Sequence, residues 1–376
     1  MSYVMVTGGQ EAIGHARNMV QYYRLKDSIE ELDVGLIRHQ MRMLRDRVMS
    51  ESGLYAPEYA ALALKQAEGD PYEAVFLLRS YSSTLVRNHV SATLNTDEMR
   101  VIRRISAAFK DIPGGQILGP TRDYTHRLLD FTLQHSTTDD NAAFLAELSS
   151  FMPEAGATGR FPKVIDRLRR EGMIAAPDKA EEEEPFDITR QSLSFPTVRS
   201  ARLQSLSRGE TGALVALAYS STSRYGKKHP VVGELRVGYV PLHIRNPLAG
   251  DETDDCLYVG ELLVSEVEMI QSFGKDSKSG ELVLEFGYGL VFGHNEQKAI
   301  AMSLLEHSLE RGGTAPAEDE QFVLKHIDPL DSGGIMSHMN LPHYVSFQSY
   351  LDMMKRIGKT SKSEQGEKSE HARDEK

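Results

Sequence analysis

The chain has 376 residues, and its content of 40% hydrophobic and 26% charged residues is ordinary for a globular protein of two domains or one large one. The formal net charge of −11 argues against nonspecific binding of nucleic acid by the whole surface. No apolar run approaches the roughly 20 residues that span a bilayer, and the first residues lack the basic leader of a signal peptide. One cysteine, Cys256, excludes an internal disulfide framework. We therefore expect a cytoplasmic protein with no nucleic acid and no membrane among its partners.

The first third of the chain is predicted to be mainly helical. Residues 3–7 have the pattern of a short strand, which a Gly8-Gly9 turn joins to an amphipathic helix over 11–23. The turn is either ordinary or exposes backbone N–H groups to an anion. Pro57 and Pro71 each stand at the first position of a further helix. The second of these helices is expected to carry into the core Val75, Leu78 and Leu85.

A further helix is predicted over 97–109 from apolar residues at helical spacing. Its inner face comprises Met99, Ile102, Ile105 and Phe109, and its outer face Arg100, Arg103 and Arg104.

The pattern becomes rich in β-strands after residue 186. Alternation and β-forming residues predict strands over 213–219, 234–240, 257–265 and 282–292. The last strand leads through Asn295, a good N-cap residue, into a helix over 296–309 that Gly312 closes.

These elements predict an α+β fold with a mainly helical N-terminal half and an antiparallel sheet with flanking helices in the C-terminal half. We expect a helical domain over 1–133 and an α+β domain over 187–358. Between them, residues 134–186 form a variable connector with one helix near 161–171, ending in four consecutive glutamates. The charged tail over 359–376 is expected to be disordered.

Two histidines near the C-terminus are candidate metal ligands. His338 and His343 are five residues apart, astride Pro342, in a stretch too rich in glycine and proline for one regular helix. Imidazole is the commonest metal ligand, but structural zinc takes four ligands and catalytic zinc usually three from protein. Further ligands would come from distant residues, substrate or another chain. The alternative is two ordinary loop histidines bonded to backbone.

A Pro-Gly-Gly loop at 113–115 precedes a second group of candidate residues. On a predicted helix, His126 and Asp130 are i,i+4 neighbours, as are Asp123 and Arg127. Such a His–Asp couple could protonate a leaving group or hold phosphate. The pattern alone favours the simpler alternative of surface ion pairs.

Two other segments carry groups of like charge. The segment 222–236, placed between two predicted strands, is expected to bind an anion or to be merely solvated. Its candidate side chains are Arg224, Lys227, Lys228, His229 and Arg236. Alternation along the third strand puts Glu266 and Glu268 on one face, where they could hold magnesium or stabilise a cation. A solvent-facing edge is the slightly favoured alternative.

The glycines at 287, 289 and 293 do not form a dinucleotide-binding loop, because their spacing is wrong and they lie within a strand. Bulges or close backbone packing explain them better.

Several blocks in a fixed order resemble a known family. They are Lys-Asp-Ile-Pro-Gly-Gly-Gln at 110–116, Asp-Tyr-Thr-His-Arg-Leu-Leu-Asp-Phe at 123–131, Asp-Ile-Thr-Arg at 187–190, Ala-Leu-Ala-Tyr-Ser at 216–220, Val-Gly-Glu-Leu-Leu at 259–263, Gly-Tyr-Gly-Leu-Val-Phe-Gly at 287–293 and Leu-Pro-His-Tyr-Val at 341–345. Together they resemble the I subunit of the bacterial carbon–phosphorus lyase core complex. The resemblance extends from residue 3 to about 356, is weakest over 134–186 and is absent from the tail.

The resemblance implies a transferase of phosphonate catabolism that displaces adenine from MgATP with a phosphonate. The product would be α-D-ribose 1-methylphosphonate 5-triphosphate, and the chain alone would act as a purine nucleosidase. Implied partners are the core subunits G, H and J, in a two-fold assembly with two copies of this chain, and the ATPase-like subunits K and L. The implied metals are Mg²⁺ with ATP and Zn²⁺ on His338 and His343 near the interface with J.

Displacement at the anomeric carbon passes through an oxocarbenium-like state, which needs cations for the triphosphate, an acid for adenine and negative charge near the ribose. The phosphate candidates are Arg224, Lys227, Lys228 and Arg236. The candidates for acid or orienting roles are Asp123 and His126, and those for magnesium or cation stabilisation are Glu266 and Glu268. Two other functions stay open: a scaffold that presents His338 and His343 to a partner's active site, and a nucleotide sensor.

Overall fold

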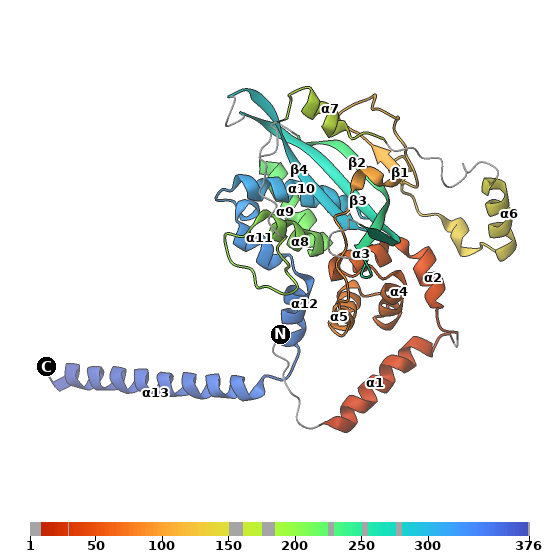
Figure 1. Ribbon diagram of the computed structural model, residues 1–376. Coiled ribbons are helices and arrows are strands. Elements are labelled where there is room, and N and C mark those ends of the chain that lie inside the picture. Colours follow the sequence, from red (N-terminus) through yellow and green to blue (C-terminus); the bar gives the residue numbers. More distant parts are fainter. Residues whose placement is uncertain are drawn as a thin grey trace.

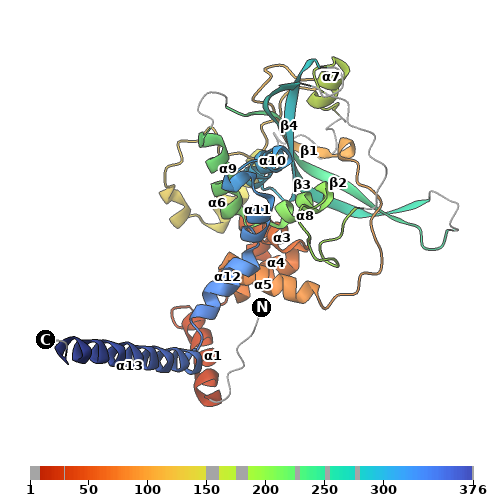
Figure 2. The same ribbon diagram turned by 90° about the vertical axis from the view of Figure 1, so that its left-hand side faces the viewer.

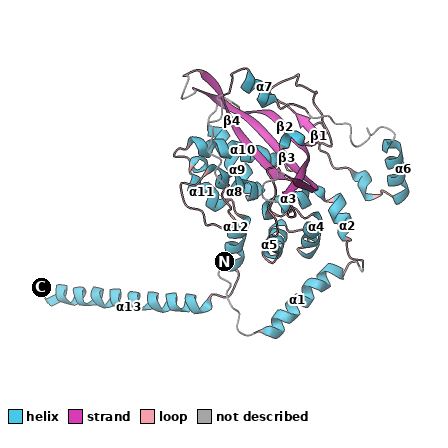
Figure 3. Ribbon diagram, viewed as in Figure 1, coloured by secondary structure: helices cyan, strands magenta, loops and turns pink. Residues whose placement is uncertain are grey.

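A computed structural model describes residues 9–28, 30–149, 161–174, 185–224, 229–249, 255–275 and 280–374. The fold is α+β, as predicted, with one four-stranded sheet and helices packed around it (Figures 1 and 3). The strand expected over 3–7 and the four glutamates at 181–184 lie outside the described residues.

The sheet has the order β1-β2-β3-β4 and is antiparallel throughout. Its strands are β1 (Arg100–Ile105), β2 (Val231–Arg245), β3 (Cys256–Lys275) and β4 (Leu282–Phe292). The long β2–β3 ladder pairs Val231 with Ile270 at one end and Arg245 with Cys256 at the other. The three strands predicted over 234–240, 257–265 and 282–292 are confirmed, and the first two extend beyond the predicted bounds.

One face of the sheet packs on helices and forms the main core. These helices are α8 (Arg199–Arg208), α9 (Thr211–Arg224) and α10 (Glu296–Arg311). Alternate strand residues, including Val237, Val267 and Val291, are almost fully buried against this layer. Gly287 and Gly289 of β4 lie against the α10 backbone, because a Cβ atom at either would overlap a carbonyl oxygen of that helix. The predicted close packing of these glycines is therefore confirmed.

A second core lies among four N-terminal helices, α2 (Val34–Gln40), α3 (Arg42–Ser52), α4 (Pro57–Gln66) and α5 (Pro71–Ser82). Pro57 and Pro71 begin α4 and α5, as predicted. Helix α1 (Gln10–Leu25) is also confirmed but has no buried residue, and it projects from the body (Figures 1 and 2). Leu85 lies beyond the end of α5 and is 47% exposed, so its predicted place in the core is wrong.

Two predicted elements have the wrong type. Residues 97–109 form the short helix η1 (Thr96–Glu98) and then β1, because pairing with β2 overrides the helical spacing. Residues 213–219 belong to α9, in which Leu214 and Ala218, four positions apart, face the core. An alanine- and leucine-rich segment favours a helix once one such face can be buried.

The described residues between β1 and α8 form few regular elements. Residues 110–130 form a loop rather than a helix, followed by η2 (Phe131–Gln134) and by α6 (Thr138–Ser149), which has no buried residue. Helix α7 (Val164–Arg170) confirms the helix predicted near 161–171. It covers the second face of the sheet, where Val164 and Leu168 pack near Phe286. The domain boundaries at 133, 186 and 358 remain predictions.

The C-terminal part is helical: η3 (Pro316–Glu318), α11 (Glu320–His326), α12 (Pro329–Met339) and α13 (Tyr344–Asp374). Helix α10 begins after Asn295, whose side chain donates to the Phe292 carbonyl oxygen instead of capping the helix. The tail expected to be disordered is helical as far as Asp374, and α13 projects from the body (Figure 1). No helix in the described part of the chain is both long enough and apolar enough to cross a membrane.

Candidate functional site

The two predicted metal ligands face each other at the junction of α12 and α13. His338 lies in the last turn of α12, and His343 directly precedes α13, so the stretch is not one helix, although its glycines lie within α12. The two Nε2 atoms are 2.9 Å apart and the ring planes are 83° apart.

The contact of His343 with the backbone determines which of its ring nitrogens carries the proton. Its Nδ1 lies 2.5 Å from the Leu341 carbonyl oxygen, which can only accept, so Nδ1 carries the proton and Nε2 keeps a lone pair. Zinc–nitrogen bonds of roughly 2.05 Å at a tetrahedral angle place two Nε2 atoms about 3.3 Å apart, close to the spacing here. The pair therefore suits two of the ligand positions of a zinc ion, and the two nitrogens are also at hydrogen-bond distance from each other. Among the described residues, however, no third His, Cys, Asp or Glu joins them.

A buried charged cluster occupies the sheet face that α7 covers. Glu266 and Glu268 of β3 lie on one face, as the alternation predicted. The Arg236 guanidinium of β2 pairs with Glu266, with Nε 3.0 Å from Oε2. Lys163, which precedes α7, places Nζ 3.0 Å from Glu266 Oε1 and 4.0 Å from Glu268 Oε1. Glu266 is 2% exposed and Glu268 9%, so the alternative of a solvent-facing edge is wrong.

The two carboxyl groups differ in protonation. Burial raises the pKa of Glu266, but Arg236 and Lys163 outweigh that effect and the net shift is downward. Glu266 also accepts hydrogen bonds from the Thr96 and Tyr288 hydroxyls at 2.8 and 3.0 Å. Burial, followed by the charge of Glu266, raises the pKa of Glu268 to about 8. Glu266 is thus ionised at neutral pH, whereas most Glu268 is protonated.

This arrangement suits acid–base chemistry better than magnesium binding. Carboxyl groups whose surroundings push their pKa values apart can serve as a proton donor beside a negative charge. Magnesium prefers ionised carboxylates, and here Arg236 and Lys163 already neutralise Glu266. Arg236 is 3% exposed and bonded to Glu266, so its guanidinium is not presented at the surface.

Asp123 belongs to a second charged network, in which the buried Arg103 of β1 joins Asp123 to Glu296. Arg103 Nη2 lies 2.5 Å from Asp123 Oδ2, and its Nε lies 2.7 Å from Glu296 Oε1. Glu296 is also 2.7 Å from His294 Nε2. The predicted Asp123–Arg127 contact forms at 3.5 Å without a helix. Asp123, at 48% side-chain exposure, is the solvent-facing end of this network.

The sequence matches the family described as "Bacterial phosphonate metabolism protein (PhnI)" over residues 2–361. The chain belongs to the PhnI family. It is 45% identical to the alpha-D-ribose 1-methylphosphonate 5-triphosphate synthase subunit PhnI of Escherichia coli (strain K12), over 94% of this chain and 98% of the relative. It is 44% identical to the putative C-P lyase subunit protein HtxH of Stutzerimonas stutzeri, over 94% and 95%. The PhnI of Rhizobium meliloti (strain 1021) is 40% identical, over 94% of each.

Other predicted site residues of this PhnI-family chain are not brought together. His126 is exposed on the loop, and no hydrogen bond in the described structure joins it to Asp130, which instead accepts from Thr132. Arg224 ends α9, so the basic segment lies between a helix and a strand. The Arg224 side chain, Lys227 and Lys228 lie outside the described residues.

Sequence reasoning missed several members of both clusters. Lys163 lies in the segment predicted to be a connector, and Tyr288 lies in a predicted glycine-rich strand with no predicted site residue. Both contact Glu266 from elements more than 20 residues away. Alternation along β4 offered one signal, because Tyr288 is the cross-strand partner of Glu268. No comparable local signal identified Lys163, Arg103 or Glu296.

Proposed function

We propose that this chain is the subunit of a carbon–phosphorus lyase system that displaces adenine from MgATP with an alkylphosphonate. The observation that carries the proposal is the match, over 94% of the chain, to relatives named as subunits of the α-D-ribose 1-methylphosphonate 5-triphosphate synthase. A ribose with a triphosphate at C5 and a phosphonate at C1 is ATP with its adenine replaced. Without phosphonate, water would take its place, which makes the isolated chain a purine nucleosidase.

Glu268 is the proposed proton donor to the departing adenine. It is a protonated carboxylic acid at neutral pH, and its buried Oε2 has no hydrogen-bond partner in the described structure. The ionised Glu266, 2% exposed, helps to keep Glu268 protonated, because its charge raises the pKa of Glu268. In this scheme Arg236 and Lys163 keep Glu266 ionised. Arg236 therefore has a positioning role and does not make the phosphate contact that the sequence predicts.

The other predicted residues keep roles as proposals. Asp123 is oriented by Arg103 and can hold the ribose or a nearby cation, and the exposed His126 is an alternative acid. Arg224, Lys227 and Lys228 are the proposed contacts of the triphosphate, which would arrive with Mg²⁺. His338 and His343 would hold Zn²⁺ through their Nε2 atoms, and the ion would supply Lewis acidity.

Assembly with other subunits is part of the proposal. The exposed apolar residues of α12 and α13 give a partner a surface to bury, and they include Ile335, Met336, Met339, Val345, Phe347, Met353 and Ile357. We propose the core subunits G, H and J and the ATPase-like K and L as partners, with two copies of this chain in the complex.

The test is purine release from MgATP by the purified chain and two variants. Glu268→Gln keeps the shape of the protonated acid but removes its acidic proton, and we expect a loss of roughly 10²- to 10⁴-fold in turnover. The matched control is Glu261→Gln, on the same strand, whose carboxylate pairs with Arg100 near the surface. Equal turnover by Glu268→Gln and wild type would remove Glu268 from the proposed mechanism.

A scaffold is the second candidate function. The observation that favours it is the exposed histidine pair, which lacks a third ligand among the described residues. A scaffold presents these two imidazoles to a partner's site and has no turnover of its own. Purine release by the isolated chain distinguishes the two functions.

A further inference from the structure

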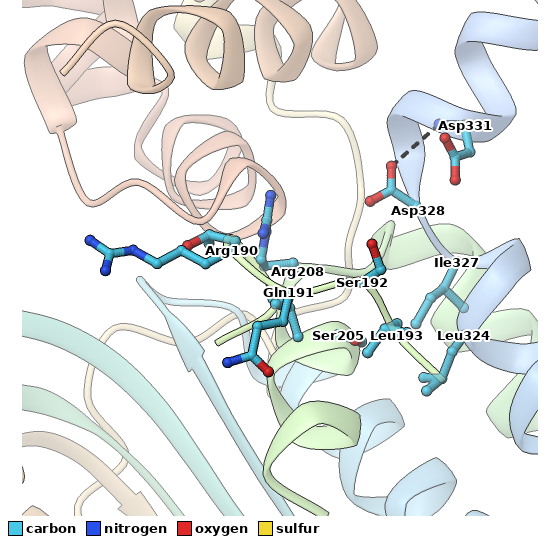
Figure 4. Close-up of a pocket in the computed structure, with 12 residues that line it drawn as sticks. Arg190, Gln191, Ser192, Leu193, Ser205, Arg208, Leu324, Ile327, Asp328 and Asp331 are labelled. Atoms are coloured by element: carbon cyan, nitrogen blue, oxygen red, sulfur yellow. Dashed lines mark hydrogen bonds between the residues drawn. The ribbon is translucent and has the colours of Figure 1, made fainter. Parts of the chain in front are cut away.

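A cavity of about 550 Å³ lies between the loop over 188–193, the C-terminal end of α8 and the start of α12 (Figure 4). Its volume is within the range of pockets that enclose a small organic ligand. The lining includes Ser205, Arg208 and Asp331. None of these residues belongs to the clusters described above.

Arg208, the last residue of α8, is a cation without a counterion in the described part of the chain. Its Nε is buried and has no hydrogen-bond partner. The two acidic groups that influence it, Asp328 and Asp187, are paired with other arginines, Arg79 and Arg87, at 2.7 and 2.6 Å. Arg208 therefore has no ion-pair partner of its own, although Asp331, which also lines the cavity, forms no ion pair among the described residues either.

A second unsatisfied donor accompanies Arg208. Ser205 lies one turn earlier on α8, and its hydroxyl is also buried without a partner among the described residues. Residues three apart share a helix face, and both line the cavity. Buried polar groups are almost always hydrogen-bonded, so two adjacent unpaired donors indicate a missing acceptor.

The backbone holds the arginine in place. Gly53, with φ of +71°, lies so close that a Cβ atom would be 2.9 Å from Arg208 Nε. Burial, followed by the charge of Arg79, lowers the pKa of Arg208. A bound anion would raise the pKa of Arg208 again, since an opposite charge favours the ionised guanidinium.

We propose that this cavity binds a tetrahedral phosphorus oxyanion through the Arg208 guanidinium and the Ser205 hydroxyl. Guanidinium groups match the geometry of such oxygens with paired N–H donors. The inference deepens the proposed function and rests on it, because both proposed substrates carry this group: the triphosphate of the nucleotide and the phosphonate.

The cavity lies beside the helix that carries His338 of the histidine pair. Asp331 lines it, and His338 follows seven residues later on α12. That spacing puts both on one helix face, about 10 Å apart along the axis. A ligand held at Arg208 could therefore extend toward His338.

The test is direct binding, by calorimetry, of inorganic triphosphate and of methylphosphonate to the purified chain. We expect one or both to bind, Arg208→Gln to weaken binding at least tenfold and Arg208→Lys to weaken it less. Arg169→Gln, at an exposed arginine near the end of α7, is the matched control and should bind as wild type does. Weaker binding of triphosphate alone in Arg208→Gln assigns the cavity to the nucleotide, and weaker binding of methylphosphonate alone assigns it to the phosphonate. Unchanged binding in Arg208→Gln, or no binding of either anion to wild type, overturns the proposal.

Thermal unfolding separates binding from folding. We expect Arg208→Gln without ligand to melt at the same temperature as wild type or higher, because it removes an unpaired charge, and to lose the rise in Tm that the anion causes. A lower Tm with unchanged anion binding would place Arg208 in the fold alone and refute the proposal. These measurements need no turnover, so a chain that binds the anion through Arg208 but releases no purine contradicts only the proposed function.

Discussion

Glu268 should make the fold less stable as the pH rises, and replacing it should remove that effect. The structure holds its pKa at about 8, against an ordinary value of 4.5, because of burial and the nearby charge of Glu266. Between these two pH values the unfolded chain has released the proton and the folded chain keeps it. Stability therefore falls with rising pH across this window.

The size of the effect follows from linkage. One pKa unit corresponds to about 1.4 kcal/mol, so the penalty that Glu268 imposes grows by about 3 kcal/mol between pH 4.5 and pH 7. Glu268→Gln cannot ionise and does not incur this penalty. We expect the variant to match wild type near pH 4.5 and to exceed its free energy of unfolding by about 3 kcal/mol at pH 7.

Urea unfolding at pH 4.5, 6, 7 and 8 measures the difference. Glu261→Gln is the control, since Glu261 on the same strand pairs with Arg100 near the surface and exposed pairs contribute about 0–1 kcal/mol. A difference between Glu268→Gln and wild type that does not change with pH would mean that Glu268 ionises normally. Glu268 would then no longer qualify as the proton donor to adenine.

Three further predictions concern other buried or clustered groups. Burial lowers the pKa of Lys298 to about 7, so the free energy of unfolding of wild type should fall by about 2 kcal/mol between pH 9 and pH 7. Lys298→Met should not show this fall, and parallel pH profiles of the two proteins in urea unfolding would refute the prediction. Gly287→Ala should lower the free energy of unfolding by about 1–3 kcal/mol or more, because the added methyl group overlaps α10. Gly358 faces open space, so Gly358→Ala should leave the free energy of unfolding unchanged. His338→Ala should abolish zinc bound to the purified complex, measured by elemental analysis, while the exposed His326→Ala keeps it; retained zinc in His338→Ala would reject the site.

Much of the fold could be predicted because its signals are local. Prolines at the starts of α4 and α5 and the alternation of β2, β3 and β4 depend on neighbouring residues alone. The prediction of a helix over 97–109 is wrong because β1 has a bulge between Val101 and Arg103. The bulge breaks the alternation, and consecutive Arg103 and Arg104 are both buried, one ion-paired with Glu296 and the other with Glu234. Only the pairing with β2, more than 130 residues later, reveals that arrangement.

The candidate site was predicted only in part, for a related reason. Alternation placed Glu266 and Glu268 on one face, but their burial depends on Lys163, 103 residues away from Glu266, and on helix α7 above them. Helical spacing placed His126 beside Asp130, and the loop there does not bring them together. The histidine pair at 338 and 343 could be found because five residues of chain suffice to form it.

We propose that this chain itself carries out the glycosidic chemistry, and the products formed from MgATP are the direct test. We would incubate the purified chain with MgATP and identify the products by chromatography and phosphorus NMR, then repeat the reaction with the G, H and L partners and methylphosphonate. We expect free adenine with ribose 5-triphosphate from the chain alone, and adenine with α-D-ribose 1-methylphosphonate 5-triphosphate from the mixture. Intact ATP in both reactions would contradict it.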